Sequence, residues 1–304
     1  MKNNKYMFSV CTAIFLSFCL LGCEEKNLPV SDTPRETVTA FLEPNLSGTI
    51  TYGTDSVNID ASNTEEGYVS VDYHGDAQKV KMQITNPDQT LYTYTLKGSD
   101  IETFPLSGGN GSYHMDVLEQ VSGDMYALAF SQDLDVSIEN EFGPFLYPNQ
   151  YVWYEPGDSV VTFGKKLSEE SHSDLEYIQN VYDYVITHIT YDEEKAAHVP
   201  TDYVPDVNET LSSGKGICFD YASLMGVLLR SQGIPTKLVV GYSGTVYHAW
   251  ISVYIEEIGW VDNIIEFNGK SWTLMDPTLA ADNDARSVQK YTSDGSNYTV
   301  KYNY

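Results

Sequence analysis

The stretch between Gly214 and Thr278 constrains this chain more than any other part of its sequence. It opens with GKGICFDYASLMGVLLRSQGIP, continues through KLVVGY and VYHAWISVYI, and closes with WTLMDPT. The periodicity of its apolar residues predicts one helix followed by strands. A cysteine, a histidine and an aspartate occur in that order, at Cys218, His248 and Asp276. Such residues can supply a nucleophile, a base and a group that orients the base.

Cys218 is predicted to lie in the first turn of its helix. Apolar residues keep a helical period after it, and Gly233 and Pro235 end the helix. A helix N-terminus offers unpaired N–H groups and a positive dipole end, which stabilise a thiolate. The same N–H groups can stabilise the oxyanion that forms when an acyl carbonyl is attacked. The alternative is a small buried cysteine that only packs the start of the helix.

His248 and Asp276 are predicted to lie on strands near this helix. Alternation in the run Tyr247–Ile255 places His248 on one face of a strand, and Trp272 and Asp276 share a face of another. A neighbouring strand could bring Asp276 to the far nitrogen of His248, where it would fix the tautomer and stabilise the imidazolium. Each residue alone is unremarkable in such a position, but together they indicate a catalytic cysteine site.

The N-terminus has the features of an export signal. Two lysines are followed by the apolar run Met7–Leu21, and the signal ends in LLGC at Cys23. This pattern is typical of a bacterial lipoprotein signal, in which Cys23 becomes the first mature residue and carries the lipid. An ordinary secretory signal that is cleaved nearby is the alternative. We therefore predict an extracytoplasmic, cell-surface protein that is anchored to the cell membrane through Cys23.

Processing would leave one thiol in the mature chain. Cys11 and Cys19 lie in the signal and lipidation would consume Cys23, so Cys218 would remain without a disulfide partner. The signal holds two of the 17 basic residues and none of the 43 acidic ones, which gives the remainder a formal charge of −28. Such a surface repels nucleic acid and anionic membranes, so we expect no nucleic-acid partner and a lipid tether. Solubility outside the cell explains the same charge.

The rest of the chain is predicted to fold as α+β in two parts. Alternating runs such as Val80–Ile84 and Tyr113–Val117, with NPDQ and SGGNGS turns between them, predict an antiparallel, immunoglobulin-like β-sandwich. An aromatic-rich connector follows, which we expect to pack against other parts of the fold. The predicted divisions are a signal peptide at 1–22, a flexible stalk at 23–45, the sandwich at 46–140, the connector at 141–170 and a catalytic domain at 171–304.

An amphipathic helix is predicted from Asp174 to about His188, with Ser171 or Ser173 as its N-cap. The segment 192–213 is predicted to be a polar loop. Its carboxylates could bind Ca²⁺, but their spacing is not that of a calcium-binding loop, which favours a solvated acidic loop. No cofactor and no dedicated metal site are therefore expected.

The motifs around Cys218, together with YHAW and MDPT, resemble the core signature of the transglutaminase-like superfamily of papain-type cysteine enzymes. The similarity extends to the helix at Asp174 and leaves the stalk and the sandwich uncovered. It implies an α+β core in which the cysteine helix packs on an antiparallel sheet. It also implies that Cys218 is the nucleophile, His248 the base and Asp276 the orienting acid. The second oxyanion donor of the family is an upstream polar or aromatic side chain, which the sequence does not locate.

The expected activity is acyl transfer from an amide through a Cys218 thioester, on a protein, peptide or cell-wall peptide substrate. If water resolves the thioester, the enzyme is a peptidase or amidase; if an amine does, it is a transglutaminase. The resemblance favours hydrolysis, because members of the superfamily outside animals are often hydrolases. A non-catalytic surface module that binds peptide or cell-wall material is the competing class. The sequence predicts no oligomeric state.

Overall fold

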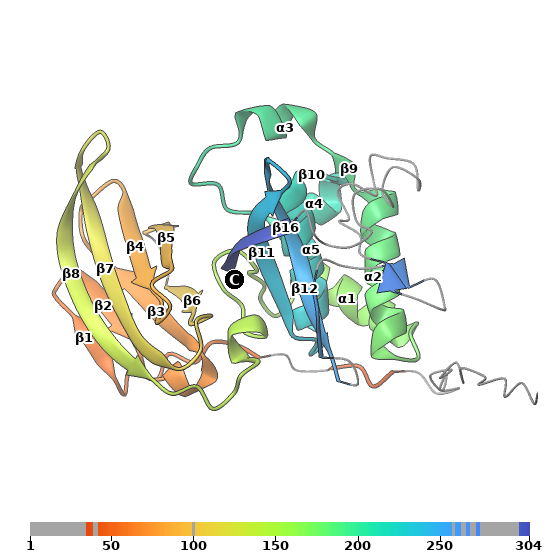
Figure 1. Cartoon of the computed structure of the whole chain (residues 1–304), viewed down its shortest axis with the longest axis horizontal. Coiled ribbons are helices and arrows are strands. Elements are labelled where there is room, and N and C mark those ends of the chain that lie inside the picture. Colours follow the sequence, from red (N-terminus) through yellow and green to blue (C-terminus); the bar gives the residue numbers. More distant parts are fainter. Residues whose placement is uncertain are drawn as a thin grey trace, which may run out of the picture. The chain divides into compact units, whose positions relative to one another are not determined.

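The computed structural model describes residues 35–38, 42–98, 101–256, 259–262 and 298–304, and the backbone of two short strands at 266–267 and 272–273. These residues form a mixed α+β fold with mostly antiparallel sheets (Figure 1). The predicted signal peptide, the lipidation site Cys23, most of the stalk and Asp276 lie outside the described residues.

Two four-stranded antiparallel sheets make up the part of the chain that was predicted to be a sandwich. The first has the order β1-β2-β3-β6 and the second β5-β4-β7-β8. Their strands are β1 (Thr51–Gly53), β2 (Val57–Asp60), β3 (Tyr68–Tyr73), β4 (Val80–Thr85), β5 (Leu91–Leu96), β6 (Glu102–Pro105), β7 (Gly111–Ser122) and β8 (Met125–Val136). A short 3-10 turn, η1 (Thr64–Glu66), precedes β3.

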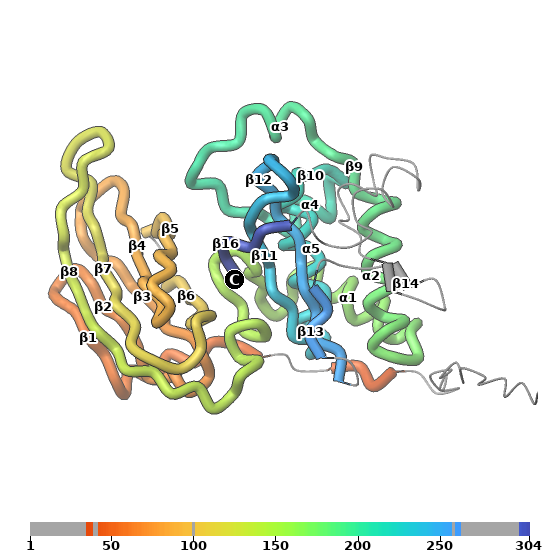
Figure 2. The backbone as a smooth tube through the Cα atoms, viewed as in Figure 1, coloured from red at the N-terminus to blue at the C-terminus, as the bar shows by residue number. Residues whose placement is uncertain are grey.

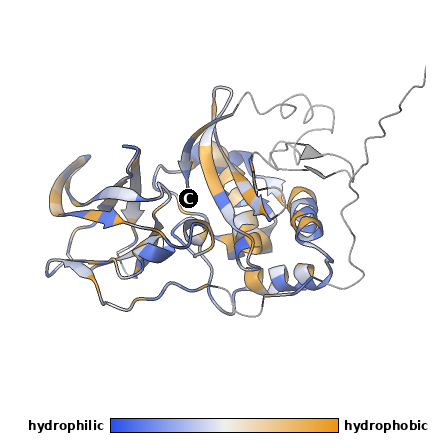
Figure 3. Ribbon diagram, turned by 60° about the horizontal axis from the view of Figure 1, so that its bottom comes forward, coloured by the Kyte–Doolittle hydropathy of each residue, from blue (hydrophilic) through white to orange (hydrophobic). Residues whose placement is uncertain are grey.

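The alternation that predicted these strands matches their burial. Along β4, the side chains of Val80, Met82 and Ile84 are buried, and the intervening residues are partly exposed. Successive residues of a strand point to opposite faces, so one face of each sheet is buried. The buried side chains of both sheets belong to one apolar core. Figure 3 shows both hydrophobic and hydrophilic stretches on these strands. Two antiparallel sheets over a common core agree with the prediction, and the immunoglobulin-like topology stays a prediction.

The α-helices of the described residues follow: α1 (Ser159–Glu169), α2 (Asp174–His188), α3 (Glu193–His198), α4 (Val207–Ser213) and α5 (Cys218–Arg230). Helix α2 confirms the predicted helix, and its N-cap is Ser173, whose side chain accepts a hydrogen bond from the Glu176 N–H. No described helix is long and apolar enough to span a membrane.

The prediction of one polar loop at 192–213 was wrong, because this segment contains α3 and α4. Both helices are too short to show an apolar period, so pattern reading missed them. Each begins at an aspartate cap: Asp192 accepts from the Lys195 N–H, and Asp206 accepts from the Glu209 N–H. Likewise, α1 lies in the predicted connector, after the 3-10 turn η2 (Gly143–Phe145).

Helix α5 packs on an antiparallel sheet of order β13-β12-β11-β16. Its strands are β11 (Thr236–Ser243), β12 (Val246–Ile255), β13 (Gly259–Val261) and β16 (Tyr298–Asn303). Buried residues of β12, such as Ala249 and Ile251, share a core with Leu224 and Leu228 of α5. Figure 2 follows the backbone through α5 into β11 and β12. This is the arrangement of cysteine helix and sheet that the resemblance implied.

The C-terminal end of α5 is held by a buried arginine. Arg230 is 1% exposed, and its guanidinium donates to the main-chain oxygens of Thr236, Tyr147 and Tyr304 at 2.8, 3.0 and 2.7 Å. Burial lowers the pKa of Arg230 to about 10. The chain then turns at Gly233, whose φ of 79° is the left-handed conformation expected at this position.

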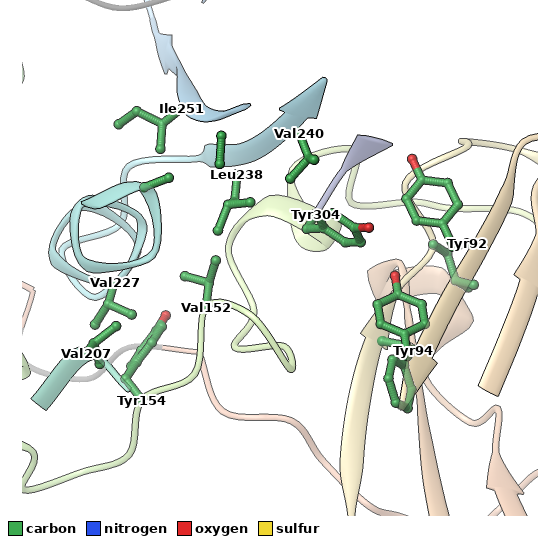
Figure 4. Close-up of a cluster of buried hydrophobic side chains, with 14 of the residues drawn as sticks. Tyr92, Tyr94, Val152, Tyr154, Val207, Val227, Leu238, Val240, Ile251 and Tyr304 are labelled. Carbon is green, nitrogen blue, oxygen red and sulfur yellow. The ribbon is translucent and has the colours of Figure 1, made fainter. Parts of the chain in front are cut away.

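Tyrosine rings form a second element of the core. Tyr151 of the predicted connector lies 5.6 Å from Tyr94 of β5 and 4.7 Å from Tyr304, between ring centroids. Tyr92 lies 5.4 Å from Tyr304, edge to face. Figure 4 shows Tyr92 and Tyr94 beside Tyr304. The connector therefore packs through its aromatic residues, as its composition predicted.

Candidate active site

Cys218 is the first residue of α5, as the sequence predicted. The chain reaches it from Gly214, which ends α4 with a φ of 64°, and through β10 (Lys215–Gly216). Strand β10 pairs in parallel with β9 (Thr190–Tyr191), which follows α2. Cys218 is partly exposed and, within the described part of the chain, is not in a disulfide. The residue therefore has both the exposure and the helix N-terminal position that a reactive cysteine requires.

A buried carboxylate holds the start of α5 in place. Asp220 is fully buried, and its side chain accepts a hydrogen bond from the Ile217 N–H at 2.8 Å. It also accepts from Lys195 Nζ at 2.7 Å and from the Tyr203 hydroxyl. One half of a capping box is thus present, in which the third helical residue binds the backbone N–H of the N-cap.

Gly216 is needed because its backbone approaches Asp220 closely. A Cβ on Gly216 would lie 2.7 Å from the Asp220 Cβ, closer than two carbons can pack. A side chain at position 216 would therefore disturb the packing of this backbone on the Asp220 side chain.

The first residues of β12 lie close to Cys218. Burial raises the pKa of Tyr247, and the charges that Tyr302, Tyr242 and Cys218 can carry raise it further. An influence of Cys218 on Tyr247 requires the two side chains to be near each other. His248 is the next residue of β12, where it pairs in register with Gly241 of β11. Strand β12, on which α5 packs, therefore carries His248 next to a tyrosine that is within electrostatic range of Cys218.

The position predicted for Asp276 is not tested, because Asp276 lies outside the described residues. The strand that was expected to precede it begins at β15 (Trp272–Thr273), which pairs with β14 (Glu266–Phe267) in a two-stranded sheet. Among the described strands, β12 has β11 and β13 as its neighbours. The triad of Cys218, His248 and Asp276 stays a prediction.

Aromatic residues line the chain around Cys218. The ring of Phe219 lies 5.1 Å from that of Tyr151 and 6.4 Å from that of Tyr203, between centroids. The ring of Tyr247 lies 5.5 Å from that of Tyr242 on the neighbouring strand. Within the described residues, no group of three or more His, Cys, Asp or Glu side chains could hold a metal ion.

Sequence reasoning missed Asp220, Lys195 and Tyr203. A signal for Asp220 was present, since an acidic residue three positions after an N-cap is a capping pattern. Lys195 and Tyr203 have no such signal, because they precede Asp220 by 25 and 17 residues and meet it only through the fold.

Residues 161–263 match the family model described as the transglutaminase-like superfamily. This segment is a transglutaminase-like domain. It runs from within α1 to just beyond β13 and therefore contains Cys218 and His248. The resemblance that the motifs suggested is confirmed for this part of the chain.

Two curated proteins match part of the chain. An uncharacterized protein of Bacillus subtilis (strain 168), YebA, is 32% identical over 124 residues, which are 34% of this chain and 17% of that protein. The kyphoscoliosis peptidase of Mus musculus is 33% identical over 108 residues, which are 30% of this chain and 15% of that protein. The chain therefore matches only about a sixth of the length of these relatives.

Solved structures of related proteins align with lower identity. The periplasmic domain of TgpA from Pseudomonas aeruginosa is 17% identical with a TM-score of 0.36, covering 79% of this chain and 98% of that one. Red sea bream transglutaminase is 12% identical with a TM-score of 0.31, covering 71% of this chain and 48% of that one. Because these TM-scores are low, the family assignment of residues 161–263 rests on the sequence match alone.

Proposed function

We propose that this protein is an extracytoplasmic, lipid-anchored cysteine enzyme that transfers acyl groups from amide bonds through a Cys218 thioester. The observation that carries the proposal is the position of Cys218, the first residue of a helix that packs on β12 and whose start is held by the hydrogen bond from the Ile217 N–H to Asp220. The transglutaminase-like domain supports the same chemistry. His248 is the proposed base and Asp276 the proposed orienting acid.

The first half of the reaction would form the thioester. His248 takes the thiol proton, and the Cys218 sulfur attacks the carbonyl carbon of the amide. The carbonyl electron pair moves to oxygen, where N–H groups of the first turn of α5 stabilise the negative charge. The carbon–nitrogen bond then breaks, and the proton held by His248 passes to the leaving amine.

The second half would release the acyl group. Water gives a proton to His248 while its oxygen attacks the thioester carbon, and the carbon–sulfur bond breaks to return the Cys218 thiolate. The product is a carboxylic acid, which makes the enzyme a peptidase or amidase. If an amine attacks in place of water, the product is a new amide and the enzyme is a transglutaminase.

We favour hydrolysis as the outcome. One matching relative, from mouse, is named a peptidase, which supports a hydrolytic role for this domain. The substrate class proposed is a protein, peptide or cell-wall peptide at the cell surface. The sheets of residues 46–140, with their expected immunoglobulin-like topology, are proposed to act as a spacer above the membrane.

Thiol reactivity distinguishes an enzyme from a non-catalytic binding module. The purified chain would be alkylated with iodoacetamide near neutral pH, and modification of Cys218 would be followed by mass spectrometry. We expect His248→Ala to slow alkylation at least about tenfold, because the variant lacks the base that takes the proton from the Cys218 thiol. His172→Ala, which removes a half-exposed histidine paired with Glu176, is the matched control. A wild-type thiol that stays unreactive would refute the enzyme.

A second experiment separates hydrolysis from amine transfer. A glutaminyl peptide would be supplied together with a labelled amine, and incorporation of the amine would be compared with release of ammonia or cleaved peptide. Hydrolysis predicts release in excess. Dominant incorporation would instead make the protein a transglutaminase.

The anchor is tested on material from the native host. Mass spectrometry of the mature N-terminus should find Cys23 as the first residue, with the mass of a lipid attached. A different first residue, or Cys23 without lipid, would contradict the proposed membrane anchoring.

A further inference from the structure

The carboxylate of Asp220 and its two side-chain partners form a charged cluster at the base of the nucleophile helix. The side chain of Asp220 has no exposed surface, whereas the side chain of Lys195 is 28% exposed. Lys195 belongs to α3, and Tyr203 belongs to the loop between α3 and α4. Lys195 Nζ also lies 4.5 Å from the centre of the Tyr203 ring. Both partners thus reach the start of α5 from a single segment, 193–206.

This cluster reaches Cys218 in two ways. Through the backbone, the bond from the Ile217 N–H to Asp220 fixes the Gly216–Ile217 peptide, one peptide before the one that joins Ile217 to Cys218. Through space, a negative charge two residues after the thiol opposes thiolate formation, and the nearby cation of Lys195 offsets that charge. Charges interact strongly here because Asp220 is shielded from water.

We propose that Asp220 is a positioning residue of the acyl-transfer site, and that Lys195 keeps its buried charge from suppressing the Cys218 thiolate. Asp220 does not touch the reacting atoms. It fixes the start of the nucleophile helix, and its pairing with Lys195 and Tyr203 ties segment 193–206 to that start. The inference rests on the proposed function, since it assigns this role with respect to Cys218 as the nucleophile.

Other titratable groups face the same cluster and must stay unchanged in a test. Asp206 and Glu209, at the start of α4, lie near enough to Tyr203 to affect its hydroxyl. Asp192 accepts a backbone hydrogen bond from Lys195. On β12, Tyr247 lies near Cys218 and His248 follows it. The variants below leave all five groups in place.

The test compares the pH dependence of Cys218 alkylation by iodoacetamide in the full chain. Lys195→Met removes the cation but keeps a side chain that packs on the Tyr203 ring. The negative charge of Asp220 is then not offset by a cation, so the pH midpoint of Cys218 alkylation should rise by about one unit. At pH values below that midpoint, alkylation should be about tenfold slower than in the wild type. Asp220→Asn leaves the cation without its anion, so the midpoint should fall.

A double variant completes the test. Asp220→Asn combined with Lys195→Met removes both charges, and its midpoint should return close to that of the wild type. Lys165→Met is the matched control, because it removes an exposed lysine of α1 that lies 4.0 Å from Glu169. Its profile should not move.

Opposite shifts in the two single variants, cancelled in the double variant, would support the proposal. Unchanged midpoints, or shifts in the same direction, would mean that Asp220 only caps the helix, and would overturn it. If Lys195→Met does not fold, Tyr203→Phe takes its place, because it removes one hydrogen bond to the carboxylate. Its midpoint should rise by a smaller amount, and an unmoved midpoint would overturn the proposal.

The proposed function can fail separately. If the wild-type chain forms no acyl-enzyme but the two single variants shift the alkylation midpoint in opposite directions, the role of Asp220 is supported and the proposed enzymatic activity is refuted. An active enzyme whose midpoints do not move would remove only the role of Asp220.

Discussion

Strand β4 of the N-terminal sheets and helix α5 both contribute to the buried core, but different interactions hold them. In β4 the inward side chains are Val80, Met82 and Ile84, which are held by contact with other apolar groups. Helix α5 has a buried charge near each end, Asp220 in its first turn and Arg230 in its last. Both charges oppose the sign of the helix dipole at their end, which is the stabilising arrangement.

This difference bears on what each region must do. Apolar packing is non-directional and tolerates side-chain changes of similar volume. Hydrogen bonds from buried charges have fixed directions, so they set the position of a helix more narrowly. A spacer needs only to be stable, whereas a nucleophile must sit within a fraction of an ångström of its partners. The interactions around α5 therefore match the proposed role of Cys218.

Alkaline pH should have the largest effect, because it acts on both regions. Burial raises the pKa of Tyr113 in β7 and of Tyr177 in α2, whose hydroxyl donates to the Leu228 main-chain oxygen of α5, and it raises the pKa of Tyr147 to about 12 from 10.0. These folded-state pKa values lie above those of the unfolded chain, so stability is complete below pH 10 and falls as pH rises above 10. We expect the chain to unfold in this range.

Tyrosinate absorbance and far-ultraviolet circular dichroism would be followed together during this titration. Because buried residues of both regions form one core, the two signals should change in a single transition. Two separate transitions would show that the sheets and α5 are independently stable, and would sharpen the comparison.

Arg230→Met should be the most destabilising single substitution. It leaves the main-chain oxygens of Thr236, Tyr147 and Tyr304 without their buried donors. We expect a loss of about 4 kcal/mol in the free energy of unfolding, measured with urea. Lys165→Met, at an exposed position, should change it by less than about 0.5 kcal/mol. Equal effects would contradict the importance of buried charge at α5.

Met82→Ala probes the sheets in the same way. Met82 is fully buried in β4, so removing its side chain leaves a cavity and should cost about 3 kcal/mol. Met125→Ala is the matched control, because Met125 is 64% exposed at the start of β8. The free energies of unfolding of the two variants, measured with urea, should therefore differ by nearly the whole cost of Met82→Ala. A cost larger than that of Arg230→Met would reverse the comparison.

The smallest effect is expected at a helix cap. Ser173→Ala removes the acceptor of the Glu176 N–H at the start of α2 and should cost about 1 kcal/mol. Ser122→Ala, at the exposed end of β7, serves as the control. Thermal unfolding should show a lower midpoint for the first variant alone, and an unchanged midpoint would mean that Ser173 adds nothing to α2.

Local pattern predicted much of the fold. The alternation in β4 and β7, the helical period of α2 and the glycine and proline after α5 are each signals within a few residues. They placed Cys218 at the start of its helix and His248 on a strand. Helices α3 and α4 escaped because six or seven residues are too few to show a period.

The sequence by itself predicted the strands, helices α2 and α5, and the chemistry that we propose, because periodicity and residue type are local properties. Only the tertiary structure decided that Asp220 is paired by Lys195 and Tyr203, and that Arg230 binds the main-chain oxygens of Tyr147 and Tyr304. These partners are far apart in the chain and have no pattern in common. Burial explains these pairs, because a charge that is removed from water is costly unless the fold brings a hydrogen-bond partner close to it.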